Sequence, residues 1–200
     1  MLATTAALTA ALAWAAPAQA QSIAAERLSE DRVDVAEVQR ASPAGKTYDA
    51  VTIIAAPVAE LCAIVQDYGA YPAFMPNTAG TTIVSSEDGH AVIDMTLSLP
   101  LGKSKRYRLQ LDAKRGGDNC QLSWKLVARA DLAPADTIAD TSGYWMFTPL
   151  PANHGKSVVE YYVYADPGPV PFGLGWIVDI MSKKSLPDTL EALRGRARKP

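Results

Sequence analysis

The sequence has few of the residues that most often carry out enzyme chemistry. It contains two histidines and two cysteines in 200 residues. His90 and His154 both lie in evident turns, and neither has the spacing of a metal ligand or a partner to activate as a base. The inventory therefore predicts no metal site, no cofactor and no catalytic residue.

An excess of charge is also missing. The chain has 19 Lys and Arg against 21 Asp and Glu, a formal net charge of -2. Nucleic-acid binding needs a basic surface that neutralises phosphates, so the composition argues against a nucleic-acid partner. With 48% hydrophobic and 20% charged residues, the chain is typical of a globular protein and has room for one domain with a sizeable core. We expect a monomer.

The sequence lacks a convincing membrane-spanning run. Residues 1–20 are apolar and end in Ala18-Gln19-Ala20, a small-x-small cleavage site. This pattern predicts a cleaved signal peptide over residues 1–20 and export to the periplasm. The segment has no Lys or Arg, which leaves two alternatives: Met1 is not the native start, or the signal is a poor one. An uncleaved anchor is the rival interpretation, but a run this short and Ala-rich is marginal for spanning a bilayer.

The two cysteines, Cys62 and Cys120, fall on different predicted elements. An exported compartment permits a disulfide between them. The alternative is two buried thiols that act as small hydrophobic side chains.

Hydrophobic periodicity predicts strands, two short helices, and then more strands. Residues 21–46 form an N-terminal segment with an edge strand at 33–38, and a short charged helix is suggested at 23–31. The main domain is predicted over residues 47–198. It begins with a strand at 47–55, a helix from Pro57 and a second short helix at 70–76. Further strands are predicted at 81–85, 90–99, 106–112, 120–126, 136–148 (with a bulge at Gly143) and 158–164.

The stretch from Pro167 to Lys199 predicts a long amphipathic helix after a Pro/Gly-rich turn. Pro187 predicts a kink or a restart, with Ser185 as the cap. The apolar stripe contains Trp176, Ile177, Ile180, Met181, Leu186, Leu190, Leu193 and Ala197, and the solvent face contains Asp188, Glu191, Arg194 and Arg198. Strands that are hydrophobic on one face need a cover, and this helix is the candidate long enough to supply it.

Three motifs, in this order, resemble the START-like, helix-grip superfamily, which includes polyketide cyclases and coenzyme Q-binding proteins. They span residues 47–197. The first is Ile54-Ala55-Ala56-Pro57 followed by Asp67-Tyr68-Gly69-Ala70-Tyr71-Pro72-Ala73-Phe74-Met75-Pro76. The second is Gly143-Tyr144-Trp145 with Pro149 and Gly155. The third is Asp166-Pro167-Gly168 with Pro171, Trp176, Ser185-Leu186-Pro187, Leu190, Leu193 and Arg194.

The resemblance implies an α+β helix-grip fold: a curved antiparallel β-sheet wrapped around a long C-terminal helix, with two short helices after the first strands. It also implies a deep apolar cavity between sheet and helix. Members of the superfamily bind lipids, sterols, quinones and polyketides, so the fold alone does not select a ligand. The resemblance supplies no catalytic residue.

The expected cavity lining combines the inward faces of the strands with the helix. It comprises Ile93, Met95, Leu97, Tyr107, Leu109, Trp124, Leu126, Trp145, Tyr162, Tyr164, Trp176, Ile180 and Met181. About half of such residues are expected to be ordinary core. Val170, Phe172 and Leu174 are expected at the cavity mouth, in transient contact with membrane. The alternative is that they plug the base of the helix against the sheet.

These observations predict binding, and with it transport, of a hydrophobic small molecule or lipid (a sterol or hopanoid, a quinone, or a fatty-acid-like molecule) in the bacterial cell envelope. Two alternatives remain: a cyclase or aromatase acting on a hydrophobic substrate, and an envelope protein-interaction module. The ionisable groups on strands that are candidates to assist catalysis are Asp94, Arg106, Arg108, Asp140, Glu160 and Tyr162. The alternation places Asp94, Arg106 and Arg108 on the outward face, so binding is favoured over catalysis.

Overall fold

The computed structural model describes residues 23–39, 45–169 and 185–198. The predicted signal peptide and the first half of the predicted C-terminal helix lie outside these ranges. Within them, no helix is long and apolar enough to cross a membrane.

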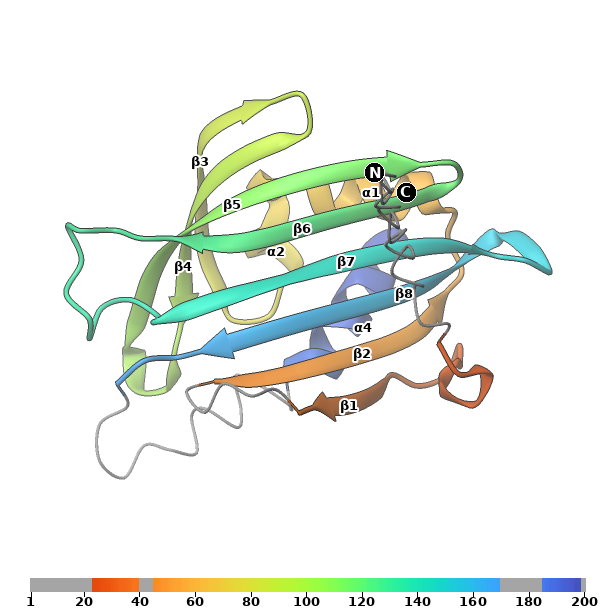
Figure 1. Cartoon of the computed structure of the whole chain (residues 1–200), viewed down its shortest axis with the longest axis horizontal. Helices are drawn as coiled ribbons and strands as arrows, with labels where there is room; N and C mark the ends of the chain where they lie inside the picture. Colours follow the sequence, from red (N-terminus) through yellow and green to blue (C-terminus); the bar gives the residue numbers. More distant parts are fainter. Residues whose placement is uncertain (1–22, 40–44, 170–184, 199–200) are drawn as a thin grey trace, which may run out of the picture.

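One antiparallel sheet dominates the described part of the chain (Figure 1). Its eight strands follow the spatial order β1-β2-β8-β7-β6-β5-β4-β3, so the first long strand pairs with the last. The strands are β1 (Asp34–Val38), β2 (Lys46–Ile54), β3 (Thr78–Glu87), β4 (His90–Ser98), β5 (Ser104–Gly116), β6 (Asn119–Val127), β7 (Asp140–Leu150) and β8 (Asn153–Asp166).

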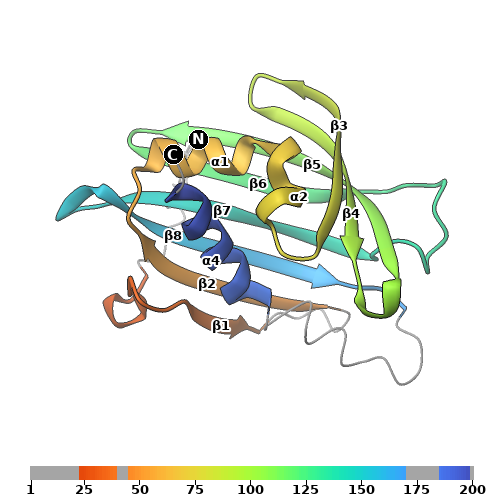
Figure 2. The same cartoon turned by 180° about the vertical axis from the view of Figure 1, so that it is seen from behind.

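All of the described α-helices lie on one face of this sheet, as the view from behind shows (Figure 2). They are α1 (Val58–Gln66), α2 (Tyr71–Phe74) and α4 (Ser185–Ala197). Three 3-10 turns accompany them: η1 (Ala25–Arg27), η2 (Tyr68–Ala70) and η3 (Pro100–Gly102). The α+β helix-grip architecture predicted from the sequence is confirmed: a curved open sheet holds the C-terminal helix against its concave face.

Period-two alternation explains which strand residues face the helices. On β4, Ala91, Ile93 and Met95 are buried, whereas the residues between them are half-buried on the opposite face. Because side chains alternate across a strand, one set enters the core and the other faces outward. The core continues into α1, where Leu61, Cys62 and Val65 are fully buried.

Helix α4 follows the predicted apolar stripe but not the predicted solvent face. Leu186, Leu190 and Leu193 are buried, as their spacing predicted. Arg194, expected in solvent, is only 6% exposed. Its Nη2 donates to Thr52 Oγ1 at 2.6 Å and to Ile53 O at 3.3 Å, because α4 packs directly on β2. Helical spacing alone could not show that Arg194 would lie against β2.

Two further local predictions were wrong. The charged helix expected at 23–31 is a single 3-10 turn, and its Arg27 instead pairs with Asp34 and Asp49 at 2.6 Å each. The bulge expected at Gly143 is absent: Gly143 pairs regularly with Trp124 on β6 and Val163 on β8. The register shift on β7 lies at Pro149 and Leu150 instead.

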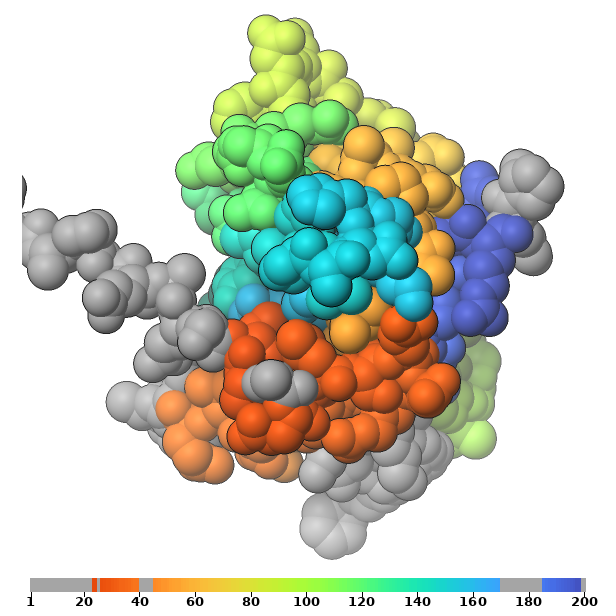
Figure 3. Space-filling model, turned by 90° about the vertical axis from the view of Figure 1, so that its right-hand side faces the viewer, coloured from red at the N-terminus to blue at the C-terminus, as the bar shows by residue number. Residues whose placement is uncertain are grey.

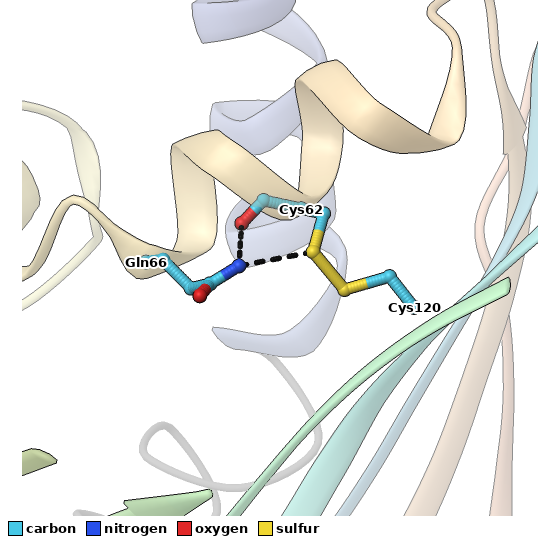
Figure 4. Close-up of a disulfide and its surroundings, with 3 residues drawn as sticks. All are labelled: Cys62, Gln66 and Cys120. Atoms are coloured by element: carbon cyan, nitrogen blue, oxygen red, sulfur yellow. Dashed lines mark hydrogen bonds between the residues drawn. A yellow bond between two sulfur atoms is a disulfide. The ribbon is translucent and has the colours of Figure 1, made fainter. Parts of the chain in front are cut away.

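A disulfide between Cys62 and Cys120 joins α1 to β6 (Figure 4). Their Cα atoms are 6.1 Å apart. Gln66, one turn further along α1, donates from Nε2 to Cys62 O at 2.9 Å and lies 3.0 Å from Cys62 Sγ. The bridge therefore anchors the helix that follows β2 to the middle of the sheet.

Candidate functional site

A cavity of about 210 Å³ lies between the concave face of the sheet and the helices. Strands β4 to β8 supply most of its wall, α2 and the turn after it supply another side, and Ser185 and Thr189 of α4 complete it. This volume is below the roughly 300–1,000 Å³ of typical small-molecule pockets.

The structure brings six of the predicted residues together in the lining: Met95, Leu97, Tyr107, Leu109, Trp124 and Trp145. Two others lie elsewhere on the concave side. Ile93 is fully buried in the core, and Leu126 is half-buried and packs against it. The predicted lining residues Trp176, Ile180 and Met181, and the predicted mouth residues Val170, Phe172 and Leu174, lie outside the described residues.

Tyr162 and Tyr164 were predicted on the wrong face of β8. The cavity is lined instead by Tyr161, Val163 and Ala165, the alternate set. Tyr162 stacks on Tyr144 on the outer face, with ring centroids 5.2 Å apart. Residues 158–164 are apolar or aromatic at almost every position, so apolar alternation was a weak guide to the face. Glu160, which alternates in step with Tyr162 and Tyr164, was the signal that their face is the outer one. The pairing of Tyr161 with Trp145 in the sheet decides it.

Three aromatic residues on adjacent strands form the central wall of the cavity. Tyr161 lies 4.1 Å from Trp145 and 5.5 Å from Trp124, measured between ring centroids. Trp124 reaches Tyr161 across β7 because Gly143 has no side chain: a Cβ there would lie 2.5 Å from Trp124 Cζ2. Gly143, where the sequence predicted a bulge, therefore leaves room for the indole ring of Trp124.

Sequence reasoning missed a second group of lining residues. Leu111 and Leu122 continue the inward alternation of β5 and β6, so extending those patterns by one step would have found them. No pattern marked the contributions of loops and helix ends. These are Tyr71, Met75, Pro76, Asn77, Thr78, Ile138, Asp166, Pro167, Ser185 and Thr189, together with Asp140 and Thr141 at the start of β7.

The polar residues gather at one end of the cavity, where β8 ends and β7 begins. Asp140 and Asp166 line this end, and Asp166 Oδ1 accepts a hydrogen bond from Gly168 N at 2.9 Å. Lys105 is buried beside it and donates from Nζ to Thr137 O at 2.7 Å and to Pro167 O at 2.6 Å. Burial lowers the pKa of Lys105. We call this end the cavity mouth.

Other elements gather at the opposite end of the molecule. The first described residues, the turn between β7 and β8, and α1 lie there, with α4 at their side (Figure 3). The hydroxyl of Thr52 lies 2.9 Å from Ser29 O and 3.0 Å from Arg32 O, which ties the N-terminal segment to β2 at this end.

Three tyrosines line the cavity, and burial raises the pKa of each. The pKa of Tyr107 rises to about 12 through burial alone. The pKa of Tyr161 rises through burial and, to a smaller extent, through the nearby Tyr107. Tyr71 donates its hydroxyl to Val65 O, and its pKa is also well above the usual value because of burial. All three hydroxyls therefore keep their protons at neutral pH.

Most of the ionisable strand residues singled out in the sequence face away from the cavity. Arg108 forms a two-pronged pair with Asp94, at 2.7 and 2.9 Å, and Arg129 joins the same carboxylate at 2.8 Å. These hydrogen bonds lower the pKa of Asp94. Glu160 accepts a hydrogen bond from Tyr144 at 2.5 Å on the outer face, and burial raises its pKa. Of that set, only Asp140 lines the cavity.

A family model described as polyketide cyclase / dehydrase and lipid transport matches residues 54–194, most of the chain. No curated protein matches the sequence significantly.

Solved structures of the same fold include lipid-transfer proteins and an aromatase/cyclase. The STAR-related lipid transfer protein from Xanthomonas axonopodis is similar over 84% of this chain and 95% of its own, with a TM-score of 0.72 and 17% identity. Human StAR-related lipid transfer protein 5 is similar over 84% and 83%, with a TM-score of 0.71 and 16% identity. The Zhui aromatase/cyclase from Streptomyces is similar over 76% and 93%, with a TM-score of 0.61 and 15% identity. At these identities the likeness establishes the fold alone.

Proposed function

Since the chain belongs to the polyketide cyclase / dehydrase and lipid transport family, we propose that it binds a hydrophobic small molecule or lipid and carries it within the bacterial cell envelope. The observation that supports this most directly is the cavity, whose wall is built of leucine, methionine, tryptophan and tyrosine side chains. An apolar cavity with a few polar groups is the usual form of a site for a hydrophobic ligand. The candidates are a sterol or hopanoid, a quinone, or a single-chain lipid.

Catalysis is the weaker alternative. The described lining contains no histidine, cysteine, lysine or arginine. Tyr107 and Tyr161 have raised pKa values, so their hydroxyls stay protonated at neutral pH and are not available as general bases. The acidic groups, Asp140 and Asp166, stand at the mouth and not beside the aromatic wall. Two of these similar structures are lipid-transfer proteins and one is an aromatase/cyclase; the chemistry of the cavity favours the first role for this chain.

Export to the periplasm is also part of the proposal. It rests on the signal-like residues 1–20, and the disulfide between Cys62 and Cys120 supports it, because disulfides persist in oxidising compartments. We further propose that the protein acts as a monomer and meets the membrane only transiently, when it loads or releases its cargo.

The proposal is tested by expressing the full sequence with its leader in a bacterial host and recovering the protein from the periplasm. Native mass spectrometry and solvent extraction should then detect a co-purified hydrophobic molecule. Val163→Phe, which adds bulk inside the cavity, should lower its amount severalfold. Val92→Phe makes the same change on the opposite face of the sheet and should leave it unchanged. Wild-type protein that carries no such molecule and binds none in solution would refute the proposal.

A further inference from the structure

The interior of the cavity contains two tyrosine hydroxyls without a partner. Tyr107 on β5 and Tyr161 on β8 both line it. Neither hydroxyl has a hydrogen-bond partner among the described residues, whereas the third lining tyrosine, Tyr71, donates to Val65 O. A phenol hydroxyl that the protein leaves unpaired can donate to, and accept from, a group inside the cavity. Such a pair therefore points to a polar group that arrives from outside the protein.

Both hydroxyls are open to the cavity. In the described ranges, the fully buried side-chain polar atoms without a partner are Thr47 Oγ1 and Asp49 Oδ1, and neither tyrosine is among them. The Tyr107 and Tyr161 hydroxyls must then reach an accessible surface, and because both side chains are partly buried and line the cavity, that surface is the cavity. They also lie close enough for one to raise the pKa of the other.

The charges of the described lining disfavour an anionic ligand group. Asp140 and Asp166 stand at the mouth, and the described lining has no cationic side chain. The nearest lysine, Lys105, already donates to Thr137 O and Pro167 O. An ionised carboxylate or phosphate inside this cavity would lose its hydration and gain no counter-charge, which is strongly unfavourable.

We propose that the ligand is an uncharged hydrophobic molecule with a hydroxyl or carbonyl oxygen, and that this oxygen is held by the hydroxyls of Tyr107 and Tyr161 inside the cavity. A phenol both donates and accepts, so the pair can satisfy either kind of oxygen. The aromatic wall of Trp124, Trp145 and Tyr161 then covers the apolar body of the ligand. This inference rests on the proposed function and narrows its ligand to alcohols and ketones, as opposed to fatty acids and phospholipids.

The test compares three probes of equal chain length: dodecanol, dodecane and dodecanoate. Binding to delipidated protein is measured by calorimetry and by the fluorescence of Trp124 and Trp145. We expect dodecanol to bind more tightly than both other probes. Tyr107→Phe and Tyr161→Phe should each weaken dodecanol binding about 2–12-fold, the loss of one net hydrogen bond, and should change dodecane binding less than twofold. Tyr162→Phe, on the outer face, is the matched control and should change neither dodecanol binding nor dodecane binding.

The outcomes separate this inference from the proposed function. If wild-type protein binds none of the three probes, the proposed function fails and the inference fails with it. If dodecane and dodecanol bind equally, or dodecanoate binds most tightly, hydrophobic binding stands and the tyrosine assignment is overturned. Circular dichroism checks that the Phe variants fold. If one of the Phe variants does not fold, the wild-type protein provides the test: tighter binding of dodecanol than of dodecane supports the tyrosine assignment, and equal binding overturns it.

Discussion

At the scale of single residues, Gly143 decides the shape of the cavity wall. It is paired on both sides in the middle of the sheet, a position where glycine is normally unfavourable because it adds no packing. Here glycine is needed because the space beside its Cα is already filled by neighbouring atoms. A Cβ would lie 2.2 Å from Tyr162 O and 2.5 Å from Trp124 Cζ2, so the backbone and the indole occupy the space that any side chain would need.

Gly143→Ala should therefore destabilise the protein by about 1–3 kcal/mol, the usual cost of overpacking. It should also displace Trp124 and weaken binding of hydrophobic probes. The free energy of unfolding from urea denaturation measures the first effect. Gly116→Ala is the control, since nothing lies within 4 Å of its added Cβ, and it should be neutral or slightly stabilising. Equal stabilities for the two variants would contradict this account.

At the scale of elements, one covalent bond adds to the packing of α1 on β6. Cys62 and Cys120 are 58 residues apart in sequence, and the segment between them includes α2, β3, β4 and β5. Closing a loop of this length in the unfolded chain removes entropy equivalent to about 4 kcal/mol in the loop-closure model. The disulfide therefore holds together the part of the sheet that carries half of the cavity wall.

Reduction of the disulfide, or Cys62→Ala with Cys120→Ala, should lower the free energy of unfolding by about 2–5 kcal/mol. Denaturation with and without dithiothreitol measures the effect. The double variant is its own control, because reductant should not change its stability further. Free thiols in the oxidised wild-type protein, detected by mass spectrometry after alkylation, would show that the bridge is not formed.

At the scale of the whole molecule, the cavity mouth and the most exposed large hydrophobic side chain among the described residues share one end. Leu101 is 75% exposed at the tip between β4 and β5. Leu97, four residues earlier, lines the cavity, and Lys105, four residues later, bonds to Pro167 at the mouth. Ile83 is also exposed, at 49%, but it stands on the edge strand β3. This arrangement favours the β4–β5 tip as a site of membrane contact during ligand exchange.

Leu101→Ser should slow transfer of a fluorescent sterol between phosphatidylcholine vesicles roughly threefold or more, because it removes apolar surface that would enter the interface. Its thermal stability should stay near that of the wild type, as for most exposed positions. Ile83→Ser removes a comparable side chain away from the mouth and should transfer at the wild-type rate. A similar slowing in both variants would assign the effect to general hydrophobicity instead.

The sequence by itself determined the architecture. Strict alternation on β4, β5 and β6 named inward residues such as Tyr107, Leu109 and Trp124, which line the cavity. The i, i+4 and i+7 spacing of Leu186, Leu190 and Leu193 identified the buried stripe of α4. These predictions succeed because each depends only on the period of one element with one covered face.

Tertiary structure decided what no single element encodes. Strand β8 carries aromatic residues on both faces, and its pairing with β7 places Tyr161 in the cavity and Tyr162 outside. Arg194 lies on the polar side of its helix, yet it is buried because that side meets Thr52 on β2. The need for glycine at position 143 becomes apparent only when Trp124 is seen to occupy the space beside it. In each case the deciding contact joins residues that are distant in sequence, and a local pattern carries no information about such a neighbour.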